Sequence, residues 1–68
     1  MMRHYLFSEE VTGEEFIVGA DSEDEAHEAA FEIGVDLVEM WEPGEVPELI
    51  CYGEISDEEA EASGLDEY

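Results

Sequence analysis

The sequence predicts a small α+β domain in which an antiparallel sheet packs against one helix. Short runs of aromatic and β-branched residues, one segment with apolar residues at helical spacing, and Gly or Pro between these segments all indicate this class. The expected order is ββαββ, followed by a short C-terminal helical turn. The 68 residues, 1–68, suffice for a single domain with a modest core, and an apolar content of 44% is too high for a disordered chain.

Two strands are expected near the N-terminus, joined as a hairpin. Segments 3–10 (RHYLFSEE) and 14–20 (EEFIVGA) flank the tripeptide VTG, in which Gly13 marks the turn. Side chains alternate between the two faces of a strand, so every second residue is expected to face the core. The expected core-facing residues of the hairpin are Tyr5, Phe7, Phe16 and Val18.

Segment 20–34 (ADSEDEAHEAAFEIG) predicts the packed helix. Ser22 and Glu25 have the spacing of a capping box, with Asp21 as a competing cap. Gly34 is expected to end this helix. A narrow stripe of small and apolar residues repeats at helical spacing, and it consists of Ala26, Ala29, Ala30 and Ile33.

Two more strands are expected at 35–41 (VDLVEMW) and 48–55 (ELICYGEI), separated by the Pro- and Gly-containing turn 42–47. Trp41 precedes this turn and is either a core residue or an exposed anchor for a partner. In so small a domain a single Trp is more often core. Cys51 is interpreted as a small, buried apolar residue.

The C-terminal segment repeats the capping pattern of the first helix. Ser56 and Glu59 have capping-box spacing, and Gly64 is a plausible stop. The segment between them carries few apolar residues, which predicts only a short helix.

The chain shows no feature of a secreted, membrane-spanning or catalytic protein. The single cysteine excludes an intramolecular disulfide, and neither a signal peptide nor an apolar membrane span is visible, so a cytoplasmic location is expected. His4, His27 and Cys51 lack the spacing of a zinc site, and no phosphate-binding loop exists. No metal, no cofactor and no enzymatic activity are therefore expected.

Charge is the dominant feature of the composition. The sequence contains 22 acidic residues and only one basic residue, Arg3, and its formal net charge is −21. This far exceeds the magnitude of about 2–8 that suffices for the solubility of a small domain. Direct binding to nucleic acid or to an anionic membrane is excluded, because both require Lys or Arg. The expected partner is a cationic protein.

Acids occupy every predicted turn and both predicted helices. Glu9, Glu10, Glu14 and Glu15 surround the hairpin turn. On the helices, like charges at i,i+4 spacing destabilise by roughly 0.2–0.5 kcal/mol per pair. The acids that combine expected exposure with helical spacing are the candidate partner-binding residues, and Trp41 is added to them as an apolar anchor. The candidates are Glu23, Asp24, Glu28, Glu32, Glu58, Glu59, Glu61 and Trp41.

Three explanations of this charge remain open. The acids are a solvated surface, as in a halophilic protein; or they imitate nucleic acid and occupy a basic groove; or they serve a regulatory module with a cationic partner that does not bind DNA. Arginine–carboxylate hydrogen bonds, often bidentate, would anchor the protein in a basic groove. In each case the domain is expected to be a monomer or a homodimer.

The acidic hairpin–helix GEEFIVGADSEDEAHEAA, the Glu-rich tail and the absence of lysine resemble small phage or mobile-element proteins. This class includes DNA-mimic inhibitors of restriction enzymes, of CRISPR effectors and of other DNA-binding enzymes. The resemblance covers residues 13–33 and implies a non-catalytic inhibitor of the anti-restriction or anti-CRISPR type. It transfers no binding residue, because such mimics have unrelated folds.

Overall fold

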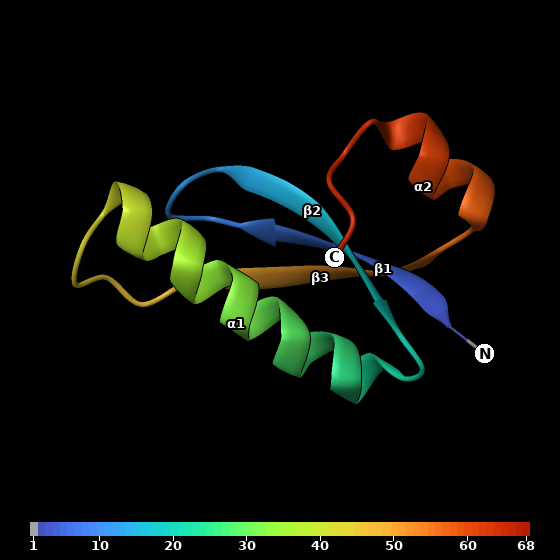
Figure 1. Ribbon diagram of the computed structural model, residues 1–68, viewed down its shortest axis with the longest axis horizontal. Coiled ribbons are helices and arrows are strands. Elements are labelled where there is room, and N and C mark those ends of the chain that lie inside the picture. The colour runs from blue at the N-terminus through green and yellow to red at the C-terminus, as the bar shows by residue number, and fades with distance from the viewer. Residues whose placement is uncertain (1) are drawn as a thin grey trace.

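The computed structural model describes residues 2–68 and contains a three-stranded antiparallel sheet with the strand order β2-β1-β3. The first strand is therefore the central one, and α1 packs across one face of the sheet (Figure 1). The α+β class, the antiparallel sheet, the packed helix and the short C-terminal helix are confirmed. The elements are β1 (Arg3–Glu9), β2 (Glu14–Ala20), α1 (Glu23–Trp41), β3 (Leu49–Ile55) and α2 (Asp57–Ser63).

The β1–β2 hairpin forms as expected, with Gly13 in the turn at a positive φ of 77°. Tyr5 pairs with Val18 and Phe7 pairs with Phe16, so the aromatic and β-branched side chains lie on one face. The rings of Phe7 and Phe16 are stacked with their centroids 6.0 Å apart. All four side chains are buried beneath α1 and form the centre of the core.

Glu9, the last residue of β1, has a fully buried side chain. Its Oε1 accepts hydrogen bonds from the backbone N–H groups of Val11 and of Thr12, the latter at 3.1 Å. Its Oε2 accepts from the backbone N–H of Glu48 at 2.7 Å. A buried carboxylate is tolerated when such donors replace its water. Glu9 was expected to add to the anionic surface at the turn; instead it joins that turn to the start of β3.

Helix α1 begins as the sequence predicts. Ser22 is the N-cap, and its Oγ accepts a hydrogen bond from the N–H of Glu25 at 3.3 Å. Three acids in the first turn lie near the positive end of the helix dipole. The side of α1 that faces the sheet is narrow and consists mainly of small residues: Ala26, Ala30, Gly34 and Val38 are buried.

The strand expected at 35–41 is wrong, because α1 continues through this segment to Trp41. Gly34 does not end the helix. A Cβ at this position would lie 3.0 Å from Cβ of Pro47 and 3.2 Å from Cδ2 of Leu49, so glycine permits the close approach of these residues. The helix ends before Pro43, whose ring restricts the preceding residue to extended conformations.

The second face of the sheet is covered at β2, whereas Ile50 and Tyr52 of β3 are exposed on it. Ile17 lies opposite the core-facing residues of β2, yet it is fully buried. The chain end runs along the outer edge of β2: the N–H of Ile17 donates to the carbonyl of Asp66 at 2.9 Å, and the N–H of Tyr68 donates to the carbonyl of Ile17 at 2.8 Å. Helix α2 precedes this segment, starts at the expected N-cap Ser56 and ends at Gly64 in the left-handed conformation.

The hydrogen bonds of Glu9 predict that the substitution Glu9→Gln strongly reduces the stability of the domain. Glu9→Gln removes the charge and replaces one acceptor oxygen by a donor that faces a backbone N–H. Hydrogen bonds to a charged group contribute about 1.5–3 kcal/mol each, so we expect the unfolding free energy to fall by about 3 kcal/mol in urea denaturation. Glu10→Gln, an exposed change in the same turn, is the control. Equal stability of the two variants would contradict the role of Glu9.

The close approach of Pro47 and Leu49 to Gly34 predicts that the substitution Gly34→Val lowers the stability of the domain. Gly34→Val improves the intrinsic helix propensity by a few tenths of a kcal/mol. The new side chain, however, must displace Pro47 and Leu49, and overpacking of this kind costs about 1–3 kcal/mol. We expect a lower melting temperature, with Gly34→Ala between valine and wild type. A valine variant that is more stable than wild type would show that helix propensity, and not packing, governs this position.

Candidate functional site

The solvent face of α1 carries a row of carboxylates with no Lys or Arg on the same helix. Asp24, Glu28 and Glu32 are exposed and lie on successive turns of the same side. Helix α1 carries seven acids in 19 residues and no Lys or Arg. At 1.5 Å per residue the helix is about 28 Å long, so the seven acids, counted on all sides of the helix, give one negative charge per about 4 Å of its length. A single DNA strand carries one charge per about 3.4 Å, so the two charge densities are close.

Glu23 does not belong to this face. Its Oε1 lies 3.7 Å from Nε2 of His27, and the thiol of Cys51 donates to the same oxygen at 3.8 Å. The side chain therefore points toward β3 and not away from the molecule. The structure separates Glu23 from the other predicted partner-binding acids of α1.

The acids of α2 form a separate surface. Glu58, Glu59 and Glu61 are exposed, as expected. Figure 1 shows α2 apart from α1, with the strands between the two helices. The two predicted groups of carboxylates are therefore not brought together. A partner with one flat or concave surface would contact one helix at a time.

Trp41 is not a core residue. It is 64% exposed, and Met40 beside it is 71% exposed. Because the segment is helical, Val38 takes the buried position of the last turn and Trp41 projects into solvent. Val46, in the following loop, is 68% exposed. Exposed apolar residues thus follow the acidic α1 and form an apolar tip. Of the two alternatives for Trp41 the core position is wrong, and its role as an anchor for a partner stays a prediction.

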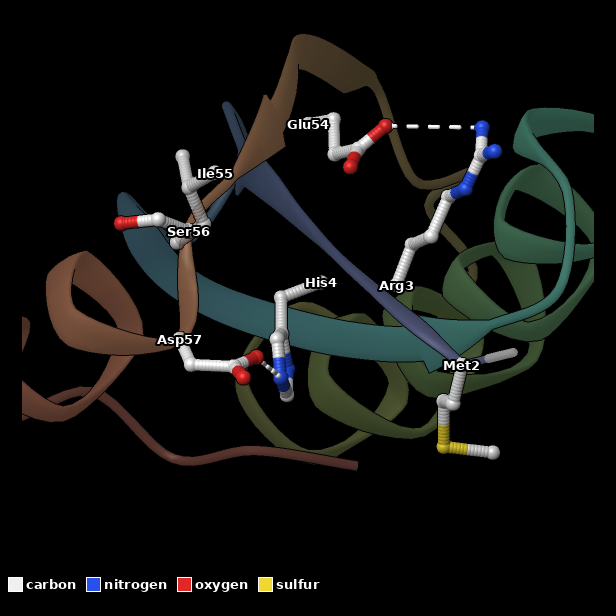
Figure 2. Close-up of a pocket in the computed structure, with 7 residues that line it drawn as sticks. All are labelled: Met2, Arg3, His4, Glu54, Ile55, Ser56 and Asp57. Atoms are coloured by element: carbon white, nitrogen blue, oxygen red, sulfur yellow. Dashed lines mark ion pairs between the residues drawn. The ribbon is translucent and has the colours of Figure 1, made fainter.

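The only arginine of the sequence lies at a hollow between the start of β1, the end of β3 and the start of α2. Figure 2 shows Arg3 extending toward Glu54, with its Nη1 3.6 Å from Oε1, and His4 extending toward Asp57. The hollow therefore carries charges of both signs. The lining residues are Met2, Arg3, His4, Glu54, Ile55, Ser56 and Asp57.

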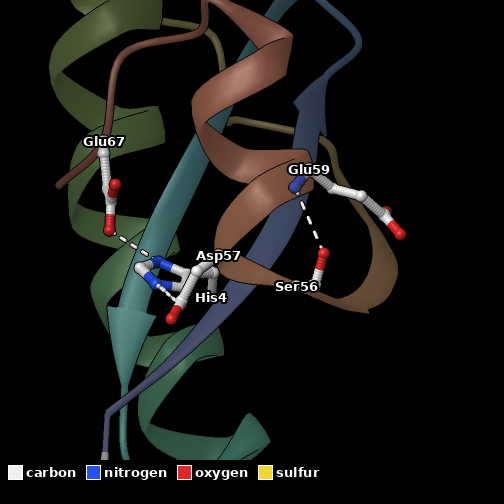
Figure 3. Close-up of polar contacts among 5 residues, drawn as sticks. All are labelled: His4, Ser56, Asp57, Glu59 and Glu67. Atoms are coloured by element: carbon white, nitrogen blue, oxygen red, sulfur yellow. Dashed lines mark hydrogen bonds and ion pairs between the residues drawn. The ribbon is translucent and has the colours of Figure 1, made fainter.

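His4 lies between two carboxylates from the C-terminal part of the chain (Figure 3). Its Nε2 is 2.6 Å from Oδ1 of Asp57, and its Nδ1 is 2.6 Å from Oε1 of Glu67. The distance from Nδ1 to Oε1 is within the range of an ion pair, but the two groups are not aligned for a hydrogen bond. His4 thereby ties β1 to α2 and to the chain end. Nothing in the sequence signals this contact, because its partners are more than fifty residues away.

Comparisons with protein-family models, with curated proteins and with solved structures gave no match. Within residues 2–68, none of the helices combines the length and the apolar character needed to cross a membrane.

The like-charge row on α1 predicts that a single reversal stabilises the isolated domain. Glu28→Lys converts two repulsive i,i+4 pairs, with Asp24 and with Glu32, into attractive pairs. At about 0.2–0.5 kcal/mol for each repulsion removed and each attraction gained, we expect about 1 kcal/mol, or several degrees in melting temperature at low salt. The gain should shrink as salt screens the charges.

Glu45→Lys is the matched control for this reversal, because Glu45 is exposed in a loop and has no helical neighbours. The two variants have the same net charge. If both raise the melting temperature equally, the repulsion is a property of the whole surface and not of the row on α1.

Proposed function

We propose that this protein is a non-catalytic inhibitor that occupies the basic nucleic-acid groove of a DNA- or RNA-binding protein. The single observation that carries the proposal is the charge density of α1 as a whole, which is close to that of one nucleic-acid strand. An inhibitor of the anti-restriction or anti-CRISPR type would act in the cytoplasm, as a monomer or a homodimer.

The chemistry of such a contact is that of a phosphate backbone. Arginine and lysine side chains that line a nucleic-acid groove donate to phosphate oxygens, and arginine also binds carboxylates in a bidentate manner. Carboxylates on successive turns, such as Asp24, Glu28 and Glu32, offer acceptors at regular intervals along one line. Since no lysine or arginine lies on α1, these acceptors are free of competing cations from the helix itself.

Helix α1 is better suited to this contact than α2. Its 19 residues span about 28 Å, whereas the seven residues of α2 span about 10 Å. A nucleic-acid groove that follows several phosphates needs a ligand of the greater length. We therefore assign the principal contact to α1 and a secondary, long-range electrostatic role to Glu58, Glu59 and Glu61.

Affinity capture from nuclease-treated bacterial lysate, followed by elution with duplex DNA, tests the proposal. We expect DNA to release one nucleic-acid-handling enzyme and to leave basic proteins in general on the column. The same enzyme should then lose DNA binding when the purified protein is added. Binding that duplex DNA does not displace would contradict mimicry.

A pair of double variants tests the assignment to α1. Glu28→Gln/Glu32→Gln and Glu58→Gln/Glu61→Gln remove the same number of charges, all from exposed helical positions. We expect the α1 variant to weaken inhibition at least tenfold and the α2 variant to weaken it far less, in a competition assay at fixed salt. Equal losses would show that net charge alone, and not the row on α1, determines binding.

The exposed tip at Met40, Trp41 and Val46 favours a second candidate, an interaction module with a cationic partner that does not bind nucleic acid. Aromatic residues are enriched at the centres of protein interfaces. In this case Trp41→Ala would abolish binding, while excess duplex DNA would leave the complex intact. Under the first proposal, by contrast, DNA competes whatever residue stands at position 41.

A further inference from the structure

We propose that Glu23, His27 and Cys51 form a binding site for a divalent late transition metal ion, with Zn²⁺ as the preferred ion. The three residues each offer one ligand atom, and these atoms lie within 4.8 Å of one another. They come from two elements, the first turns of α1 and the middle of β3. The inference is independent of the inhibitor function proposed above.

Two of the three distances between ligand atoms are close to those around a tetrahedral zinc ion. Bond lengths of about 2.3 Å to sulfur and about 2.0–2.1 Å to nitrogen and oxygen place tetrahedral ligands about 3.3–3.6 Å apart. In the structure Oε1 of Glu23 lies 3.7 Å from Nε2 of His27 and 3.8 Å from Sγ of Cys51. A contraction of a few tenths of an ångström brings these two pairs to the distances around a metal. The remaining pair, His27 and Cys51, has its ligand atoms within 4.8 Å of each other, so the side chain of His27 must move by up to about 1.3 Å toward Cys51 when the ion binds.

Two of the three ligands are held in place by the core. Cys51 is half-buried and packs against the core cluster from β3. The ring of His27 packs edge-on against Phe7, with the centroids 5.2 Å apart. Glu23 precedes His27 by one helical turn, so its longer side chain is the adjustable ligand.

The ligand types select the metal. Thiolate and imidazole favour zinc and its neighbours, whereas Ca²⁺ and Mg²⁺ require a shell of oxygen atoms. Binding converts the thiol of Cys51 to a thiolate and releases one proton to solvent. Three protein ligands leave the fourth tetrahedral position to a water molecule.

The electrostatic surroundings favour a cation at this site. A helix N-terminus carries about half a positive charge, which alone would repel a metal ion. Asp24 and Glu25 stand beside Glu23 in the first turn, and their formal charges exceed this partial charge. The net charge of −21 adds a negative potential over the whole molecule. A bound ion would connect the start of α1 to β3 and would reduce the repulsion between the first-turn acids.

Titration with Co²⁺ under reducing conditions, read by absorption, tests the site directly. A cobalt–thiolate bond gives a charge-transfer band in the near ultraviolet that carboxylates do not produce. We expect this band in the wild-type protein, saturation at one ion per monomer, and displacement of Co²⁺ by Zn²⁺ but not by a similar concentration of Mg²⁺. Size-exclusion chromatography of the loaded protein should show no metal-dependent dimer.

Matched variants separate a built site from the general attraction of cations to an acidic protein. Glu23→Gln, His27→Gln and Cys51→Ser should each weaken Zn²⁺ binding about 100-fold or more, since even outer-shell groups contribute 10–100-fold. Glu25→Gln removes the same charge as Glu23→Gln from an exposed position on the same turn and should retain binding within a fewfold.

Two results would overturn the proposal. One is the absence of a thiolate band, or a band that forms only when two chains share one ion. The other is an equal loss of Zn²⁺ affinity in Glu23→Gln and Glu25→Gln, which would leave only diffuse binding to the acidic surface. Circular dichroism of each variant without metal confirms that the fold is retained.

Discussion

The carboxylate of Glu9 joins the hairpin turn to the start of β3, beside the backbone hydrogen bond from the N–H of Glu10 to the carbonyl of Glu48. Glu9 pairs with Glu14 on β2 and with Leu49 on β3, so both neighbours of the central strand reach the same point. Its two oxygens accept backbone hydrogen bonds from the hairpin turn and from Glu48. In a chain crowded with acids, this acid is structural, because its hydrogen bonds replace the solvent that burial removes.

The remaining acids fall into groups with different environments. Glu54 faces Arg3, Asp57 and Glu67 face His4, and Glu23 faces His27 and Cys51. The row on α1 faces solvent, and like charges stand one turn apart along it, as Asp57 and Glu61 do on the shorter α2. Self-repulsion of this kind reduces the stability of a domain that already has a small core. A cationic surface of a partner would compensate this repulsion along α1.

Local signals in the sequence identified the hairpin, both serine caps and the stop at Gly64, because each depends on residues only a few positions apart. The segment 35–41 was misassigned, because Gly34 resembles a helix stop until Pro47 and Leu49 are seen against it. The exposure of the α1 acids was predictable from helical spacing. The approach of Cys51 to Glu23 and His27 was not predictable, because it depends on how β3 lies beneath α1. The expectation that Trp41 is more often a core residue failed because the segment 35–41 is helical and not a strand.

The central position of β1 also has a consequence for synthesis on the ribosome. Its pairing with β2 needs only a short turn, but its pairing with β3 must wait until the chain has been extended by about 40 further residues, the separation of Glu9 from Glu48. During that interval one edge of β1 has unsatisfied backbone groups, and such edges promote association between nascent chains. The acidic hairpin turn and the acidic α1 emerge in the same interval, so like charge keeps neighbouring incomplete chains apart until β3 arrives.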